Sequence, residues 1–218
     1  MIKFPLFLSV AFLFLGCSST PVKNEWQVQS VNAYESSKLY FLKDENTLAS
    51  TDLKRAKKYA RQSADLSTLA KIELSQCALH VSVLQDDNCS AYKELEPLAK
   101  DSLSHSYYLF LQNKYTQKDI NNLPARYKNF AAYKLAGDYE QAQRELLSTK
   151  EIISKSIMAS LIKEKLDANT VKVLIDELSF YGYKKAVLAW LEFYQTKLNN
   201  TDEIEDVKKR LQVLKDTK

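Results

Sequence analysis

The sequence contains little glycine and proline. Its 218 residues include three glycines and four prolines, whereas average usage would give roughly 15 glycines and 11 prolines. This shortage argues against β-sandwiches, barrels and propellers, which need many positive-φ turns, and against glycine-rich phosphate-binding loops. Lys+Arg 31 against Asp+Glu 27 leaves a formal charge of +4, too small to indicate a nucleic-acid partner. Abundant lysine, leucine, alanine and glutamate favours helices joined by short connections.

An apolar run occupies the N-terminus. Lys3 supplies one positive charge ahead of a run from Phe4 to Leu15 that Ser9 interrupts. Twelve helical residues rise about 18 Å, well short of the roughly 30 Å hydrocarbon core of a bilayer. The pattern therefore favours a cleaved secretory segment over a transmembrane helix.

The apolar run ends at Gly16 and Cys17, and Ser18 follows. This ending resembles the bacterial lipobox, in which a small residue precedes a cysteine that is lipidated and becomes the mature N-terminus. The resemblance implies a signal peptide over residues 1–16, a covalent lipid on Cys17 and a lipidated tether over residues 17–23. Because Ser18 stands where an inner-membrane retention aspartate would lie, the outer membrane is favoured, with the chain facing the periplasm. An ordinary signal peptide with a chance cysteine is the alternative.

Two further cysteines, Cys77 and Cys89, are expected to form a disulfide, because an exported chain meets an oxidising compartment. Their Cα atoms must then lie within about 7 Å of each other. The bond forms more easily if the helix carrying Cys77 ends near His80 and residues 81–83 are extended. Two independent thiols are the alternative. A metal site using Cys77 and His80 is disfavoured, because two ligands do not make a site, and no metal is expected.

Residues 24–218 are predicted to form an all-helical domain. Apolar residues recur at three- and four-residue spacing, and no segment shows sustained period-two alternation. Helix starts are expected at Asn24, Ser50–Asp52, Ser67, Asn88 or Ser90, Pro97 and Pro124, with a polar loop over 119–122. Later helices are expected over residues 150–166, 170–181, 183–198 and 201–214.

The segment from Tyr133 to Ala142 contains Gly137 and Tyr139 and resembles the hinge of a tetratricopeptide repeat. In such a hinge the glycine leaves the first helix in a left-handed conformation, the tyrosine fills the gap between the helices, and the alanine lets them approach closely. Weaker echoes occur over residues 180–186 and 52–56. The resemblance implies an irregular solenoid of antiparallel helix pairs, and a general helical bundle is the alternative.

Few residues suggest catalysis. The sequence has two histidines, and they cannot support a convincing Ser–His constellation. The carboxylates of Glu94 and Glu96 are two residues apart, so they point to different sides of a helix. No catalytic residue, small-molecule substrate or cofactor other than the covalent lipid is expected. The basic residues over 54–61 are interpreted as the solvated face of an amphipathic helix.

The function expected from these features is that of a scaffold or assembly factor that binds other envelope proteins and reaches the membrane through its lipid. Helix pairs stacked in series leave a curved inner face built mostly from the first helix of each pair. Tyrosine is enriched in binding hot spots, and the candidate partner-binding residues on these helices are Tyr34, Tyr127, Tyr133, Glu177 and Tyr181. For each tyrosine, packing between helices is the competing explanation. The alternative functions are a structural part of an envelope machine, such as a flagellar or secretion apparatus, and a peptidoglycan-acting hydrolase.

Overall fold

The computed structural model describes residues 24–64 and 66–216. Within these ranges the chain forms twelve α-helices and one short 3-10 helix, with no strand, so the all-α prediction is confirmed. The expected signal peptide, Cys17 and the tether to residue 23 lie outside the described residues. None of the described helices is both long and apolar enough to cross a membrane.

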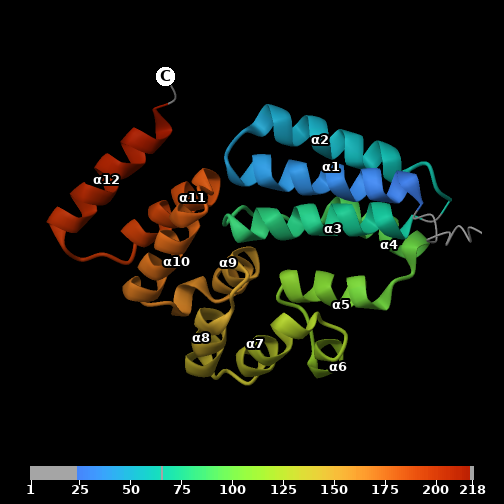
Figure 1. The fold of residues 1–218 in the computed structure, drawn as a ribbon. Coiled ribbons are helices and arrows are strands. Elements are labelled where there is room, and N and C mark those ends of the chain that lie inside the picture. The colour runs from blue at the N-terminus through green and yellow to red at the C-terminus, as the bar shows by residue number, and fades with distance from the viewer. Residues whose placement is uncertain (1–23, 65, 217–218) are drawn as a thin grey trace, which may run out of the picture.

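The helices follow one another through short connections (Figure 1). Their bounds are α1 (Glu25–Leu42), α2 (Asn46–Ala60), α3 (Ser67–Ser82), α4 (Ser90–Ala99), α5 (Ser102–Leu111), α6 (Gln117–Ile120), α7 (Ala125–Leu135), α8 (Tyr139–Ser148), α9 (Ile152–Leu161), α10 (Ala168–Phe180), α11 (Lys184–Gln195) and α12 (Thr201–Lys215). The 3-10 helix η1 (Lys163–Lys165) follows α9. Among consecutive helices the most extensive packing occurs in the pairs α1–α2, α3–α4, α7–α8 and α10–α11.

Small residues explain the close approach of α1 and α2. Ser30 donates a hydrogen bond to the carbonyl of Ala56 at 2.8 Å, and Ser37 donates to that of Ala49 at 2.7 Å. Both serines are fully buried, so these bonds satisfy hydroxyls that water cannot reach. The predicted helix start at Ser50–Asp52 is wrong, because α2 begins at Asn46. Ser50 instead bonds back to the Thr47 carbonyl within the helix.

Proline and polar residues near α4 to α6 also behave differently from the prediction. Pro97 lies inside α4 instead of opening a helix. The next helix, α5, is opened by Asp101, whose carboxylate accepts the backbone N–H groups of Leu103 and Ser104. The predicted polar loop over 119–122 overlaps α6, which a reciprocal cap between Thr116 and Asp119 stabilises.

The two glycine hinges have the backbone conformation that the sequence predicts. Gly137 has φ +76° and Gly182 has φ +67°, both in the left-handed region. The expectation that Tyr139 fills the gap between helices is wrong, since its side chain is exposed and the Lys165 ammonium lies 5.4 Å from the ring centroid. The predicted echo over residues 52–56 lies within α2 and forms no hinge.

Contacts between helices that are distant in sequence hold the molecule together. The carbonyl oxygen of Ser82, the last residue of α3, accepts hydrogen bonds from Ser156 of α9 at 2.6 Å and from the Trp190 indole of α11 at 3.1 Å. Lys185 of α11 forms an ion pair with Asp44, in the turn after α1, at 2.9 Å. In an ideal solenoid each repeat contacts only its neighbours, whereas here α9 and α11 also pack on α3 and α1. The solenoid stays a prediction.

Candidate functional site

A groove with a volume of about 390 Å³ lies where five helices meet, and we call it the tyrosine groove. Its lining comes from α1, α3, α5, α7 and α9, three of which are the first helices of packed pairs. A second hollow of about 410 Å³ adjoins it between α3, α5 and the segment that leads into α7. Ser75 and Tyr107 line both, so the two hollows are adjacent and meet at these residues.

Three tyrosines form the floor of the tyrosine groove. The Tyr127 hydroxyl lies 2.8 Å from the Ser154 hydroxyl and 3.4 Å from that of Tyr107. The rings of Tyr107 and Tyr127 stack with centroids 5.4 Å apart. Burial raises the pKa of Tyr107 and of Tyr127 above the ordinary tyrosine value. Both therefore remain protonated hydroxyls at neutral pH.

Tyr34, the third floor tyrosine, has a buried hydroxyl that forms no hydrogen bond among the described residues. Its side chain is 8% exposed, and burial raises its pKa well above the usual range. The Ser75 hydroxyl is close enough to oppose this shift but does not meet the geometry of a hydrogen bond. An unpaired buried hydroxyl costs about 1–3 kcal/mol. Tyr34 is thus a polar group at the groove that lacks a partner.

Ion pairs between basic and acidic side chains surround the floor of the tyrosine groove. Lys38 pairs with Glu35 on α1, and Arg126 lies 3.8 Å from Glu151 at the start of α9. The Glu151 carboxylate also caps α9, since it accepts the backbone N–H of Ser154 at 2.6 Å. These groups provide both donors and acceptors at the edge of an aromatic surface, an arrangement typical of protein-binding sites.

The rim of the adjoining hollow combines paired cations with an exposed apolar side chain. Lys71 lies 3.3 Å from Asp101, and Lys128 donates to the Asn121 carbonyl at 2.7 Å. Leu103 of α5 lines the same hollow and is 58% exposed. The hollow is therefore more apolar at its entrance than the tyrosine groove.

The structure brings two of the five candidate partner-binding residues together. Tyr34 and Tyr127 line the tyrosine groove as parts of its buried floor. Tyr133, in the last turn of α7, and Tyr181, the C-cap residue of α10, are exposed and line neither hollow. Glu177 accepts hydrogen bonds from Lys155. Tyr107 was not among the predicted residues, because it belongs to the run of large apolar side chains over residues 107–111 of α5.

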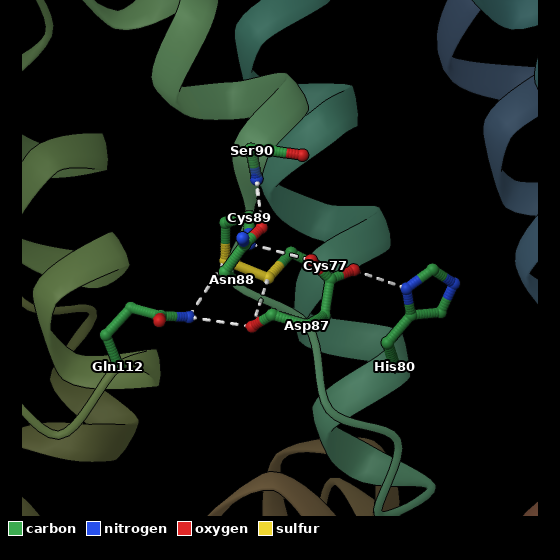
Figure 2. Close-up of a disulfide and its surroundings, with 7 residues drawn as sticks. All are labelled: Cys77, His80, Asp87, Asn88, Cys89, Ser90 and Gln112. Atoms are coloured by element: carbon green, nitrogen blue, oxygen red, sulfur yellow. Dashed lines mark hydrogen bonds and ion pairs between the residues drawn. A yellow bond between two sulfur atoms is a disulfide. The ribbon is translucent and has the colours of Figure 1, made fainter.

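The structure joins Cys77 and Cys89 in a disulfide with Cα atoms 5.3 Å apart (Figure 2). The expectation that the helix ends near His80 is wrong, because α3 continues to Ser82. The chain instead folds back after α3, and Cys89 adopts the left-handed conformation, with φ 53°, at the N-cap of α4. A returning loop thus brings Cys89 to the middle of a continuous helix.

Polar groups surround the disulfide on several sides (Figure 2). One carboxylate oxygen of Asp87 accepts the backbone N–H of Cys89 at 2.7 Å, and the other contacts Nδ1 of His80. The Gln112 amide, from the end of α5, donates to the Asp87 carbonyl at 2.9 Å and to the Cys89 sulfur at 3.4 Å.

Comparison with known proteins identifies no relative of this chain. No protein-family model matches it, and neither the curated proteins nor the solved structures contain a significant match. Any functional assignment therefore depends on the residues and geometry described above.

Proposed function

We propose that this protein is a lipid-anchored component of the bacterial envelope whose tyrosine groove binds a polypeptide segment of another envelope protein. The lipobox-like ending at Gly16 and Cys17 supports the anchor. The proposed tether, residues 17–23, spans at most about 24 Å when fully extended. The helical body then stays close to the outer membrane, facing the periplasm, where membrane-associated partners are concentrated.

The observation that carries the proposal is the aromatic floor of the tyrosine groove, with the unpaired hydroxyl of Tyr34 buried just beneath its surface. Buried polar groups in proteins are almost always hydrogen-bonded, so an exception needs an explanation. A polypeptide brings backbone carbonyl oxygens and N–H groups as well as side chains. The aromatic floor supplies contact area for such a partner, and the charged pairs at the rim supply polar contacts.

The size of the surface also suits a polypeptide. The two hollows, of about 390 Å³ and about 410 Å³, each fall within the usual range for ligand-binding clefts. Because they join at Ser75 and Tyr107, one extended or helical segment can lie across both. Exposed Leu103 offers an apolar contact at one end.

We further propose that the pairs α7–α8 and α10–α11 are tetratricopeptide-like units. Each pair turns at a positive-φ glycine, Gly137 or Gly182. A fully buried alanine follows each turn in the second helix, Ala142 at 0% exposure and Ala186 at 1%. The tyrosine groove, lined largely by first helices, lies where repeat proteins of this class place their inner binding face.

Site-specific photocrosslinking in intact cells tests this function. A photoreactive amino acid at Leu103, on the rim of the adjoining hollow, is expected to capture a partner protein. The matched control is the same amino acid at Val213, which is 72% exposed on α12 and lines neither hollow. Equal capture at both positions would contradict the proposal, and no capture at either would favour the structural-component alternative.

The substitution Tyr34→Phe tests the hydroxyl. It removes one unpaired oxygen, so the free energy of unfolding is expected to stay constant or rise by about 1 kcal/mol, while capture at Leu103 falls several-fold. The control is Tyr115→Phe, because the Tyr115 hydroxyl already donates to the Ala131 carbonyl at 2.9 Å and lies outside the groove. That variant is expected to lose about 1 kcal/mol of stability and keep full capture. Unchanged capture in Tyr34→Phe would refute the role of the hydroxyl.

A further inference from the structure

The loop that closes the disulfide assembles three metal-ligating side chains. The sulfur atoms of Cys77 and Cys89 and a carboxylate oxygen of Asp87 all lie within 4.8 Å of one another. Cys77 comes from α3, whereas Asp87 and Cys89 come from the returning loop. From the sequence alone only Cys77 and His80 were weighed as metal ligands. The fold instead brings Asp87 and Cys89 next to Cys77. Two thiolates and a carboxylate are a ligand set that zinc accepts.

Two neighbouring groups direct positive dipoles toward the Cys89 sulfur. Cys89 is the N-cap residue of α4, a helix of 10 residues, so its sulfur lies at the positive end of the helix dipole. The Gln112 amide donates a hydrogen bond to the same sulfur. His80 contacts the Asp87 carboxylate, and such an outer partner orients a ligand and tunes its basicity.

A solvent-filled groove lies next to one residue of the cluster. A polar groove of about 270 Å³ lies beside the returning loop, and both Asp87 and Gln112 line it. The two cysteines themselves are 2% exposed.

We propose that the reduced form of this loop binds one zinc ion through Cys77, Cys89 and Asp87. An external dithiol breaks the S–S bond, giving two thiols while the dithiol is oxidised to its own disulfide. The zinc ion then displaces both thiol protons to solvent and forms two Zn–S bonds. The disulfide and the zinc site are thus mutually exclusive states of one loop, and this proposal is independent of the tyrosine groove.

Zinc titration of the purified protein in both redox states tests the proposal. The protein is reduced with a phosphine, freed of reductant without oxygen, and titrated with zinc against a chromophoric chelator. One zinc ion is expected to bind per reduced chain and none per oxidised chain. Zinc is also expected to raise the melting temperature of the reduced chain only. Equal zinc binding in the two states, or none in either, would overturn the proposal.

Two variants identify the ligands. Asp87→Asn keeps an oxygen for the Cys89 amide but removes the ligand charge, and we expect its zinc affinity to fall by about tenfold or more. Asp86→Asn removes the same charge from an exposed neighbour outside the cluster, and its affinity is expected to stay unchanged. Circular dichroism covers the case in which reduction unfolds the chain. In that case zinc is expected to restore the helical signal, and a failure to restore it would refute the site. Equal zinc affinities of the Asp87→Asn and Asp86→Asn variants would also refute it.

Discussion

The buried side chain of Lys155 gives Glu177 a structural role that the sequence did not indicate. Its side chain is 5% exposed on α9, and its ammonium donates to both carboxylate oxygens of Glu177, on α10, at 2.7 Å. An ammonium group removed from water is stable only when it is paired. Glu177 was predicted to bind a partner protein, and in the structure it neutralises this buried charge.

Replacement of Glu177 by alanine is therefore expected to destabilise the protein. Breaking a fully buried pair costs 3–5 kcal/mol, but the Glu177 side chain is 39% exposed, so water screens part of the charge. We expect a loss of about 1–3 kcal/mol in urea unfolding. Glu140→Ala breaks an exposed pair with Arg144 and is expected to cost less than about 0.5 kcal/mol. Similar losses in the two variants would contradict this role.

Asp167 links stability to pH. Its carboxylate accepts the backbone N–H of Thr170 at 2.7 Å, and this bond lowers the pKa of Asp167 below its usual value. Because the unfolded-state pKa is about 3.9, the stabilisation is present above about pH 4 and is lost as the pH falls below that value.

Asp167→Asn keeps the capping oxygen but removes the charge at the start of α10. We expect the variant to be about 0.3–1 kcal/mol less stable than the parent at pH 7. The two proteins are expected to converge as the pH falls through the lowered pKa of Asp167, where the parent carboxylate is also protonated. Urea unfolding at several pH values measures the difference. If the difference in unfolding free energy between the two proteins does not change with pH, the charge of Asp167 contributes nothing to stability.

At the scale of elements, helix ends were harder to predict than helices. The start of α3 at Ser67 is confirmed, whereas Pro97 and Ser50 were wrongly assigned to helix starts. Proline is tolerated near a helix end once the carbonyl four residues earlier can lose its partner, and α4 ends two residues after Pro97. Such tolerance depends on neighbouring packing, which local sequence does not record.

Gly137 provides a test of the hinge between α7 and α8. A Cβ atom built at this position meets nothing within 4 Å, so the cost of substitution is conformational and not steric. Gly137→Val is expected to lose more than about 1 kcal/mol in thermal or urea unfolding, because a β-branched residue at positive φ is strained. Gly137→Asn, which tolerates the left-handed region, is expected to lose clearly less. Equal melting of the valine variant and the parent would refute the hinge.

For the whole molecule, the Ser82 carbonyl marks the point where distant helices meet. It accepts bonds from residues 74 and 108 positions away in sequence, on α9 and α11. Trp190 is fully buried there and also donates to the Ser156 hydroxyl at 3.0 Å. This junction holds together α3 and α9, two of the helices that line the tyrosine groove.

The proposed anchor makes a prediction for the intact protein in cells. Cys17→Ala is expected to abolish membrane attachment and leave an unlipidated precursor, because the lipid chains supply about 0.8 kcal/mol per buried CH₂ group. Fractionation after a high-salt wash measures the effect. Ser18→Asp is the control, since it keeps the cysteine and is expected to stay membrane-bound. Recovery of the alanine variant in the membrane at the parent level would refute the anchor.

The candidate site was only partly visible in the sequence. Tyr34 and Tyr127 were predicted from their place on first helices, and both line the tyrosine groove. Tyr133 and Tyr181 were predicted by the same rule but lie exposed near the ends of α7 and α10, outside the groove. Helical spacing states which side of a helix a residue occupies, but not which other helix covers that side.

The sequence by itself determined the helical class and the two left-handed turns, because glycine scarcity, apolar spacing and positive φ are local properties of the chain. Only the tertiary structure decided that α9 and α11 reach back to α3, that Asp87 lies beside both cysteines, and that the Tyr34 hydroxyl lacks a partner. These features join residues far apart in sequence or depend on the path of a loop. Long-range packing, which no local pattern encodes, settles them.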